Sequence, residues 1–377
     1  MGPMAGVILA DMGAEVIKIE PAPNGDETRR LKGFGTGFFP YYNRNKKSLV
    51  VNLKSDDGRR ILEQLIGTAD VLIENFAPGT VERLGFGWER VRDINPRLVY
   101  CSLKGFMPGP YEKRPALDEV CQMMGGLAYM TGPRGRPLRA GASIIDVMGG
   151  SYGVIGILTA LLDRQSTGRG QFVKATLFES VAMLMAQHMI VLPLTGDAAP
   201  PMPERGRSWS VYDLFETVDR EQVFLGITSD RHWTRFCEVF GFGDLFADHR
   251  LDTNQGRVEQ REWFLPELKK RLAALPRDEI MRKAEEACIP FAQVARPEDL
   301  FEDEHLNQSG GLDELVLPNG TAAKLPKLPL RVGNYDFAFR SAPPELGKGS
   351  RGLLESLDFS EEQISSWCRD GVLGPVC

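Results

Sequence analysis

The amino-acid sequence predicts an α/β protein: a large, doubly wound and mostly parallel sheet, followed by a smaller α+β part. Two observations lead to this prediction. Over the first half, short runs of Val, Ile and Leu alternate with helix-type patterns, and strands separated by helices pair in parallel with helices on both faces. The composition then changes at a proline-rich segment, 198–207, after which hairpin and amphipathic-helix patterns follow. We therefore expect two domains.

The expected elements of the first part follow in a regular order. An apolar helix pattern covers residues 3–12 and is ended by Gly13. Short apolar runs predict strands at 14–19, 49–53, 70–76, 97–103 and 172–175. Ser55 is placed to cap the helix after the second strand, because a serine hydroxyl accepts from the free N–H groups of a first turn. Two long apolar helices are predicted at 147–163 and 177–191.

The second part differs in pattern. Alternating runs at 211–217 and 222–227 predict a hairpin. Amphipathic helices are expected at about 230–240, 257–273 and 277–287. Further on, the Pro318-Asn319-Gly320 segment predicts a turn between two short strands, and Ser360 with Gln363 forms a capping box for the last helix.

Composition excludes several function classes. The chain has 377 residues and a net charge of −6, whereas a general nucleic-acid surface requires an excess of basic residues. No apolar run approaches ~20 residues, so we expect no membrane span. Acidic Asp11 and Glu15 argue against a signal peptide. The six cysteines and four histidines lack metal-ligand spacing, so we expect no metal site and a cytoplasmic protein with reduced thiols.

Few motifs suggest catalysis. Neither a phosphate-binding loop nor a nucleophile elbow is present, the glycine-rich segment 33–37 is typical of a loop, and Cys121 is typical of a buried thiol. The remaining candidate is the carboxylate of Asp146, just before the first long apolar helix. It could be an N-cap. It could also be an exposed nucleophile, with Gly149 and Gly150 leaving room for substrate and N–H groups for an oxyanion.

Short motifs occur along the chain in a specific order: GAEVIKIE at 13–20, NKKS at 45–48, ENFAPG at 74–79, SLKGF at 102–106 and TGRGQ at 167–171. With them the sequence resembles the family III CoA-transferases, the group of formyl-CoA and carnitine CoA-transferases that also includes α-methylacyl-CoA racemases. The family pattern has a further strand before the Gly-Pro matched by Gly2-Pro3.

The resemblance also implies a domain organisation. Residues 1–200 and 310–377 would form a discontinuous, Rossmann-like CoA-binding domain, and residues 205–305 would form a small domain inserted in it. Members of the family form interlocked homodimers, so we expect the same here.

The resemblance implies that Asp146 is the nucleophile. An aspartate side chain is ionised at neutral pH, so it attacks an acyl-CoA thioester without a general base. An aspartyl-CoA thioester follows, from which CoA passes to a small carboxylic acid. CoA or acyl-CoA is then a substrate, and no permanently bound cofactor is expected. Asp118 would support the site, and backbone amides near Gly149 and Gly150 are our candidates for the oxyanion donors.

The CoA-binding residues are likewise implied by the resemblance. They are Val51, Asn52, Leu53, Lys54, Asn75, Phe76, Arg83 and Leu177. Arg83 matches an arginine that contacts a CoA phosphate, and a dianionic group requires paired charge. The alternative for Lys54 and Arg83 is a solvated surface cation.

Two other functions stay open at this point. A racemase or epimerase of the same fold needs a histidine where this chain has Leu117, and leucine cannot transfer a proton. A non-catalytic CoA-binding protein is the second alternative. The acid is not specified, although four arginines suggest a carboxylated acyl group if they are not simply solvated: Arg114, Arg134, Arg136 and Arg139.

Overall fold

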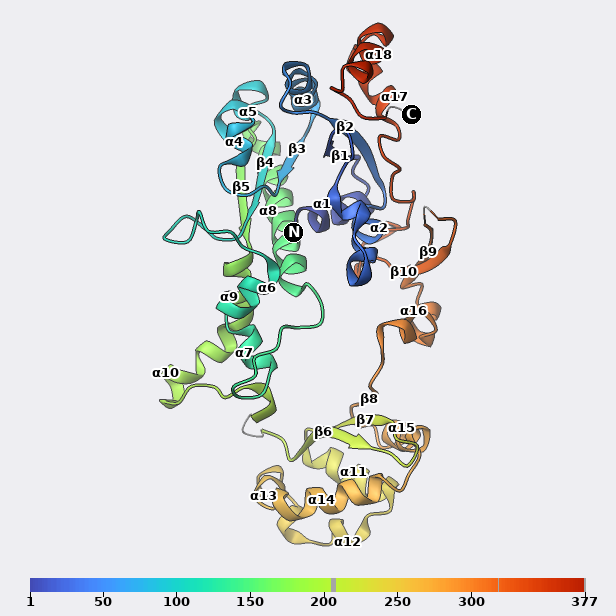
Figure 1. The fold of residues 1–377 in the computed structure, drawn as a ribbon. Coiled ribbons are helices and arrows are strands. Elements are labelled where there is room, and N and C mark those ends of the chain that lie inside the picture. Colours follow the sequence, from blue (N-terminus) through green and yellow to red (C-terminus); the bar gives the residue numbers. More distant parts are fainter. Residues whose placement is uncertain (205–207, 318, 376–377) are drawn as a thin grey trace. The chain divides into compact units, whose positions relative to one another are not determined.

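A computed structural model describes residues 1–204, 208–317 and 319–375. The chain divides into two compact units (Figure 1). Unit 1 is Met1–Glu204 together with Glu304–Cys377, and unit 2 is Arg205–Asp303. The domain organisation expected from the resemblance stays a prediction.

Unit 1 alternates helices and strands, as expected for an α/β protein. Its elements before unit 2 are α1 (Gly2–Asp11), β1 (Val16–Pro21), α2 (Phe38–Asn43), β2 (Lys46–Val51), α3 (Asp56–Thr68), β3 (Val71–Glu74), α4 (Thr80–Arg83), α5 (Trp88–Ile94), β4 (Val99–Lys104), α6 (Asp118–Met124), α7 (Leu127–Thr131), α8 (Ile144–Thr167), β5 (Phe172–Thr176), α9 (Leu177–Met189) and α10 (Val191–Thr195). After unit 2 follow α16 (Glu304–Gln308), β9 (Leu312–Val316), β10 (Ala322–Pro326), α17 (Ser350–Glu355) and α18 (Glu361–Arg369).

The parallel strands of unit 1 form two separate sheets rather than the one expected. β1 pairs with β2, and β3, β4 and β5 form a sheet in that order, all in parallel. Within the described residues no strand pairing joins the two sheets. Alternation of strands and helices predicts parallel pairing, but it does not determine which strands are neighbours. The α/β class is confirmed, whereas the single continuous sheet is not.

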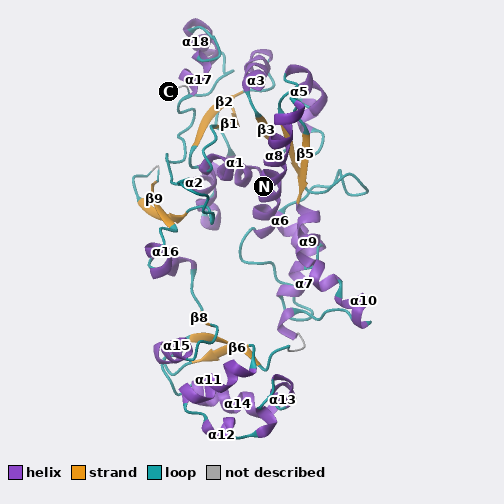
Figure 2. Ribbon diagram, turned by 180° about the vertical axis from the view of Figure 1, so that it is seen from behind, coloured by secondary structure: helices purple, strands orange, loops and turns teal. Residues whose placement is uncertain are grey.

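Helix α8 is the central helix of unit 1 and packs on α1, β4 and β5 (Figures 1 and 2). Glycines allow this close approach. A Cβ at Gly153 would lie 2.8 Å from Leu103 Cδ2, and one at Gly156 would lie 2.5 Å from Val173 Cγ1. These two glycines therefore allow α8 to lie close to the side chains of β4 and β5.

Two helical segments are long and apolar enough to cross a membrane by length and composition alone: Ile144–Thr167 and Leu177–Thr195. The expectation of no membrane span was based on uninterrupted apolar runs, and this finding does not overturn it. Small residues such as Gly149 and Ser151 interrupt the run in α8 without making the helix polar. Core helices of soluble proteins pass the same test, and α8 buries one side against the sheet, so the finding is weak evidence for a membrane span.

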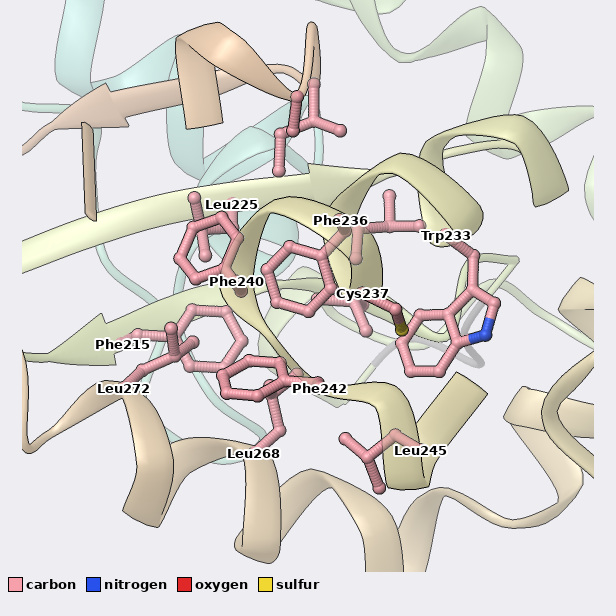
Figure 3. Packing of buried hydrophobic residues seen from close by; sticks show 14 of the residues in the cluster. Phe215, Leu225, Trp233, Phe236, Cys237, Phe240, Phe242, Leu245, Leu268 and Leu272 are labelled. Atoms are coloured by element: carbon pink, nitrogen blue, oxygen red, sulfur yellow. The ribbon is translucent and has the colours of Figure 1, made fainter. Parts of the chain in front are cut away.

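Unit 2 is built on an antiparallel sheet of β6 (Val211–Glu216), β7 (Gln222–Ile227) and β8 (Phe291–Gln293). The hairpin predicted for β6 and β7 is confirmed. The helices are α11 (Asp230–Phe240), α12 (Gly243–Phe246), α13 (Asn254–Glu259), α14 (Arg261–Leu272) and α15 (Arg277–Glu286). An aromatic core that includes Phe236, Phe240 and Phe242 fills the space between helices and sheet (Figure 3).

The predicted helix caps are confirmed, and one predicted helix needs a correction. Ser55 accepts from Gly58 N at 3.1 Å, and Ser360 with Gln363 forms the predicted capping box. The single helix expected at 257–273 is two helices that meet at Gln260, because an amphipathic period does not detect a one-residue break. Of the predicted turn, Pro318 lies outside the described residues.

Candidate active site

Asp146 is the third residue of α8, and its own side chain is not the cap of that helix. The N-cap is Ser143, which makes no side-chain cap bond. The carboxylate of Asp118, from the first turn of α6, instead accepts from Ile145 N at 2.8 Å and from Asp146 N at 3.0 Å through Oδ2. Asp118 therefore satisfies the free N–H groups at the start of α8. The N-cap interpretation of Asp146 is wrong, and its carboxylate is left for other contacts.

The Asp146 side chain is 37% exposed, and its Oδ1 accepts from the backbone nitrogen of Met1 at 3.0 Å. The negative charges of Asp146 and Asp118 also act on Tyr42 of α2. Burial raises the pKa of the Tyr42 phenol, and Tyr41, Asp146 and Asp118 add to that rise. The nucleophile candidate thus lies in a partly open site with a hydrogen-bond donor at one oxygen.

Asp118 is itself held in place by two side chains that sequence reasoning did not assign to the site. Its Oδ1 accepts from Gln122 Nε2 at 2.5 Å and lies 3.5 Å from Arg139 Nη2. Gln122 is fully buried, and its Oε1 accepts from Ala140 N at 2.8 Å. The one available signal was spacing, since Asp118 and Gln122 are i and i+4 on α6 and share one face.

Gly149 and Gly150 do not open the site toward substrate. A Cβ at Gly149 would lie 2.3 Å from Met1 Sδ, and one at Gly150 would lie 2.9 Å from Met4 Cβ, so both glycines are packed against the start of α1. They also lie beyond the first turn of α8, where N–H groups bond to carbonyls of the preceding turn. This placement corrects the expectation that they clear space for substrate and supply free N–H donors.

Cys121 is a buried thiol, as expected. Burial raises its pKa to about 11, and the negative charges of Asp118, Glu179 and Asp146 contribute to that rise. A thiol with such a pKa is protonated at neutral pH and is a poor nucleophile. Together with the exposed leucine at position 117, this leaves the carboxylates as the reactive groups on the α6 side of the site.

Asn75 and Phe76 follow the carboxyl end of β3, the edge of a parallel sheet at which ligands bind. Asn75 Oδ1 accepts from Gly2 N at 2.9 Å, and its Nδ2 donates to Leu103 O at 2.9 Å. The Phe76 ring is 45% exposed, and Phe76 O accepts from Lys104 Nζ at 2.8 Å. Asn75 therefore lies at the start of α1, next to Met1, which contacts Asp146.

The other expected CoA contacts divide into exposed and buried residues. Lys54 and Arg83 are exposed, and Arg83 Nη2 donates to Thr80 Oγ1 at 2.8 Å. Asn52 and Leu53 are half-buried in the loop after β2. Val51 and Leu177 are different, because their side chains are 1% and 4% exposed and belong to hydrophobic cores. Direct ligand contact from those two side chains is therefore not favoured by this structure.

Within the described parts of the chain, no group of three or more His, Cys, Asp or Glu side chains could hold a metal ion.

Known proteins match the chain over most of its length. The family described as CoA-transferase family III matches residues 1–350. The formyl-CoA:oxalate CoA-transferase of Streptomyces avermitilis is 36% identical over 394 residues, which cover 99% of this chain and 96% of that protein. The acetyl-CoA:oxalate CoA-transferase of Acetobacter aceti is 33% identical over 367 residues, which cover 96% and 93%.

A solved structure is similar to this chain over most of its length. A CAIB/BAIF family protein from Brucella suis has a TM-score of 0.83 and 29% identity, covering 94% of this chain and 95% of that one. The resemblance inferred from short motifs is thereby confirmed. The chain belongs to CoA-transferase family III and is an enzyme of the CoA-transferase type.

Proposed function

We propose that the enzyme moves CoA from an acyl-CoA donor to a carboxylic acid through an aspartyl-CoA thioester on Asp146. The observation that carries the proposal is the position of Asp146. Its carboxylate is 37% exposed in the first turn of α8, while another residue caps that helix. A side chain freed from capping and fixed at its backbone can serve as a nucleophile.

The first half of the reaction loads the enzyme. A carboxylate oxygen of Asp146 attacks the thioester carbon, the C–S bond breaks, and CoA leaves as a thiolate. The product is a mixed anhydride between Asp146 and the acyl group. The thiolate then attacks the Asp146 carbonyl carbon, which forms the aspartyl-CoA thioester and releases the donor acid as a carboxylate.

The second half reverses these steps with the other acid. The acceptor carboxylate attacks the aspartyl thioester, CoA leaves as a thiolate, and a second anhydride forms. The thiolate then attacks the acceptor carbonyl, which gives the new acyl-CoA and restores the Asp146 carboxylate. Atoms and charges balance, and no proton transfer is required.

Each attack on the Asp146 carbonyl places negative charge on its oxygen. The backbone nitrogen of Met1, which donates to Oδ1 at 3.0 Å, is the donor best placed to stabilise that charge. Asp118 acts indirectly, since it accepts from the backbone nitrogens of Ile145 and Asp146 and so fixes the first turn. We assign Asp118 as a positioning residue.

For CoA we propose contacts at Asn75, Phe76, Asn52, Lys54 and Arg83, since these residues are at least partly exposed or lie at a strand end. The interlocked homodimer and the cytoplasmic location stay predictions. A racemase is not favoured, because residue 117 is a leucine whose side chain, 71% exposed, carries no titratable group.

Substitution of Asp146 tests the proposal. Asp146→Asn keeps the size of the side chain and removes the nucleophile, so we expect transferase turnover to fall by about 10³-fold or more while CoA binding persists. Glu119→Gln, an exposed carboxylate next to Asp118, is the matched control and should keep full turnover. Full turnover in Asp146→Asn would overturn the proposal.

A further inference from the structure

Glu74 and Lys104 form a buried ion pair at the ends of two neighbouring strands. Glu74 is the last residue of β3, and Lys104 is the last residue of β4. Lys104 Nζ lies 2.7 Å from Glu74 Oε2, and the two side chains are 10% and 3% exposed. Ser102, which pairs with Glu74 across the two strands, donates its hydroxyl to the other carboxylate oxygen. Side chains two residues apart on a strand share a face, so Ser102 and Lys104 reach the carboxylate from the same side of the sheet.

The same ion pair holds both backbone polar groups of Phe76. Phe76 N donates to Glu74 Oε2 at 3.1 Å, and Phe76 O accepts from Lys104 Nζ at 2.8 Å. Backbone groups of a loop can pair with water instead, so these two bonds are not needed merely to satisfy them. The N–H and C=O groups lie on either side of the Phe76 Cα. The two bonds therefore restrict the backbone dihedral angles from which the ring projects.

The ring on this restrained backbone is 45% exposed, whereas phenylalanine side chains are usually buried. Beyond it, Thr80 N donates to Ala77 O at 3.1 Å and closes a turn before α4. The loop from β3 to α4 is thus held at its start by the ion pair and at its end by this turn. An apolar group presented on a fixed backbone loses little conformational freedom when it binds a ligand.

Stability alone does not account for a buried ion pair at this place. Desolvation of two charges offsets most of their attraction, and apolar side chains of similar volume are often equally or more stabilising. What Glu74 and Lys104 do that apolar side chains cannot is bond to the backbone of Phe76. They do so at the carboxyl edge of a parallel sheet, where ligands bind.

We propose that the Glu74–Lys104 ion pair is a positioning device for acyl-CoA, because it fixes the Phe76 backbone and so orients the exposed Phe76 ring toward the bound thioester. Glu74 and Lys104 are then positioning residues that act through Phe76 without touching CoA themselves. This inference rests on the CoA contact at Phe76 in the proposed function, but it does not depend on the covalent chemistry of Asp146.

The test measures the dissociation constant of CoA by calorimetric titration of the full chain. Phe76→Ala should weaken binding about 10-fold, through loss of one aromatic contact. The double variant Glu74→Met with Lys104→Met removes both charges together, so no buried charge is left unpaired. It should weaken binding about 5- to 10-fold, because the ring is no longer preorganised. Added to Phe76→Ala, it should cause less than about a twofold further loss, since the ion pair acts through that ring.

Lys174→Met is the matched control. Lys174 lies on β5 opposite Ser102, its side chain is 15% exposed, and it pairs with Glu112 at 3.0 Å. Its removal should keep the CoA dissociation constant within about twofold, because this ion pair is formed away from the loop after β3.

Lys104→Arg tests the same coupling with a conservative change, in case the double variant folds poorly. It keeps the cation, but a planar guanidinium cannot reproduce both contacts of Nζ. We expect binding of CoA to weaken about threefold when Phe76 is present and to stay unchanged in the Phe76→Ala background.

Steady-state kinetics separates positioning from general damage. The double variant should raise KM for acyl-CoA and keep kcat within about threefold, because bound acyl-CoA still reaches Asp146. A fall in kcat without a rise in KM would overturn the inference. So would wild-type CoA affinity in the double variant or in Phe76→Ala, or equal weakening by the double variant with and without the Phe76 ring.

Hydroxylamine trapping at saturating acyl-CoA separates this inference from the proposed function. If the wild type and the double variant both form a covalent adduct at residue 146 and bind CoA equally well, only the positioning role is rejected. If the wild type forms no adduct but the double variant and Phe76→Ala weaken CoA binding in the coupled manner, the positioning role stands and the covalent mechanism fails.

Discussion

The carboxylate of Asp118 accepts a hydrogen bond from the backbone nitrogen of Asp146 at 3.0 Å, so one acid holds the helix turn that carries another. The same carboxylate accepts from Ile145 N at 2.8 Å, and Gln122 and Arg139 contact its second oxygen. A helix end that would otherwise be unsatisfied is therefore capped from a separate helix. This separation of tasks leaves the Asp146 side chain available for chemistry.

Removal of the Asp118 carboxylate should destabilise the first turn of α8. We expect Asp118→Ala to lower the free energy of unfolding by about 1–2 kcal/mol, the usual effect of losing a cap, and to reduce turnover because Asp146 loses its fixed position. Urea denaturation and steady-state rates measure both effects. Glu119→Ala is the control for an exposed acid in the same turn. An Asp118→Ala variant as stable and active as the wild type would refute the capping role.

Gly150 should not tolerate a methyl group. An added Cβ would lie 2.9 Å from Met4 Cβ and 3.0 Å from the backbone Met1 O, and both contacts belong to the start of α1. Overpacking of this kind costs about 1–3 kcal/mol, so Gly150→Ala should unfold at lower denaturant concentration. Gly67→Ala, within α3 and with open space around its Cβ, should instead stabilise by about 0.5–1 kcal/mol. Equal behaviour of the two variants would contradict the packing described here.

Because Lys46 is buried, we expect the free energy of unfolding to depend on pH. Its Nζ donates to Pro3 O at 2.9 Å, and burial lowers its pKa from 10.5 to about 7, with Lys18 and Arg44 adding to the decrease. Between about pH 7 and 10 the unfolded chain holds this proton and the folded chain does not. The contribution of Lys46 to stability therefore rises with pH across that window and is least favourable below it.

The comparison is between Lys46→Met and the wild type, each denatured at pH 7 and pH 9.5. The free energy of unfolding of the wild type should increase relative to that of the variant at the higher pH. Lys47→Met is the control, since the Lys47 side chain is 50% exposed and pairs with Glu15 at the surface. If the difference between wild type and Lys46→Met does not depend on pH, the lowered pKa is wrong.

Arg83 is expected to contact a phosphate of CoA. Arg83→Ala should raise KM for acyl-CoA about 10-fold, because a charged hydrogen bond to phosphate is lost. The same variant should show no such loss with an acyl-pantetheine thioester, which carries no phosphate. Arg92→Ala removes a comparable surface cation and should change neither value. A loss of equal size with both thioesters would exclude the phosphate contact.

The sequence predicted best what depends on near neighbours along the chain. Ser55 and Ser360 were identified as caps because a cap bonds to a residue three positions away. The β6–β7 hairpin was predicted because its two strands are joined by a short turn. The family resemblance came from motifs whose order can be read directly.

Contacts between distant segments were not predictable in the same way. The bond from Ile145 to Asp118 joins residues 27 positions apart, and no local pattern marks it. The role of Gly150 depends on contacts with α1, which lies far from it in sequence. Arg139 differs from Arg134 and Arg136 in the lower exposure of its side chain, which the sequence does not reveal. The division into two parallel sheets is likewise a matter of which strands meet in space.

The most direct test of the account is peptide mass spectrometry after acyl-CoA is incubated with the enzyme and the adduct is trapped with hydroxylamine or borohydride. We predict modification of the wild type at residue 146, dependent on acyl-CoA, and none in Asp146→Asn. Modification at another residue, or the same amount of adduct in Asp146→Asn, would contradict the central claim.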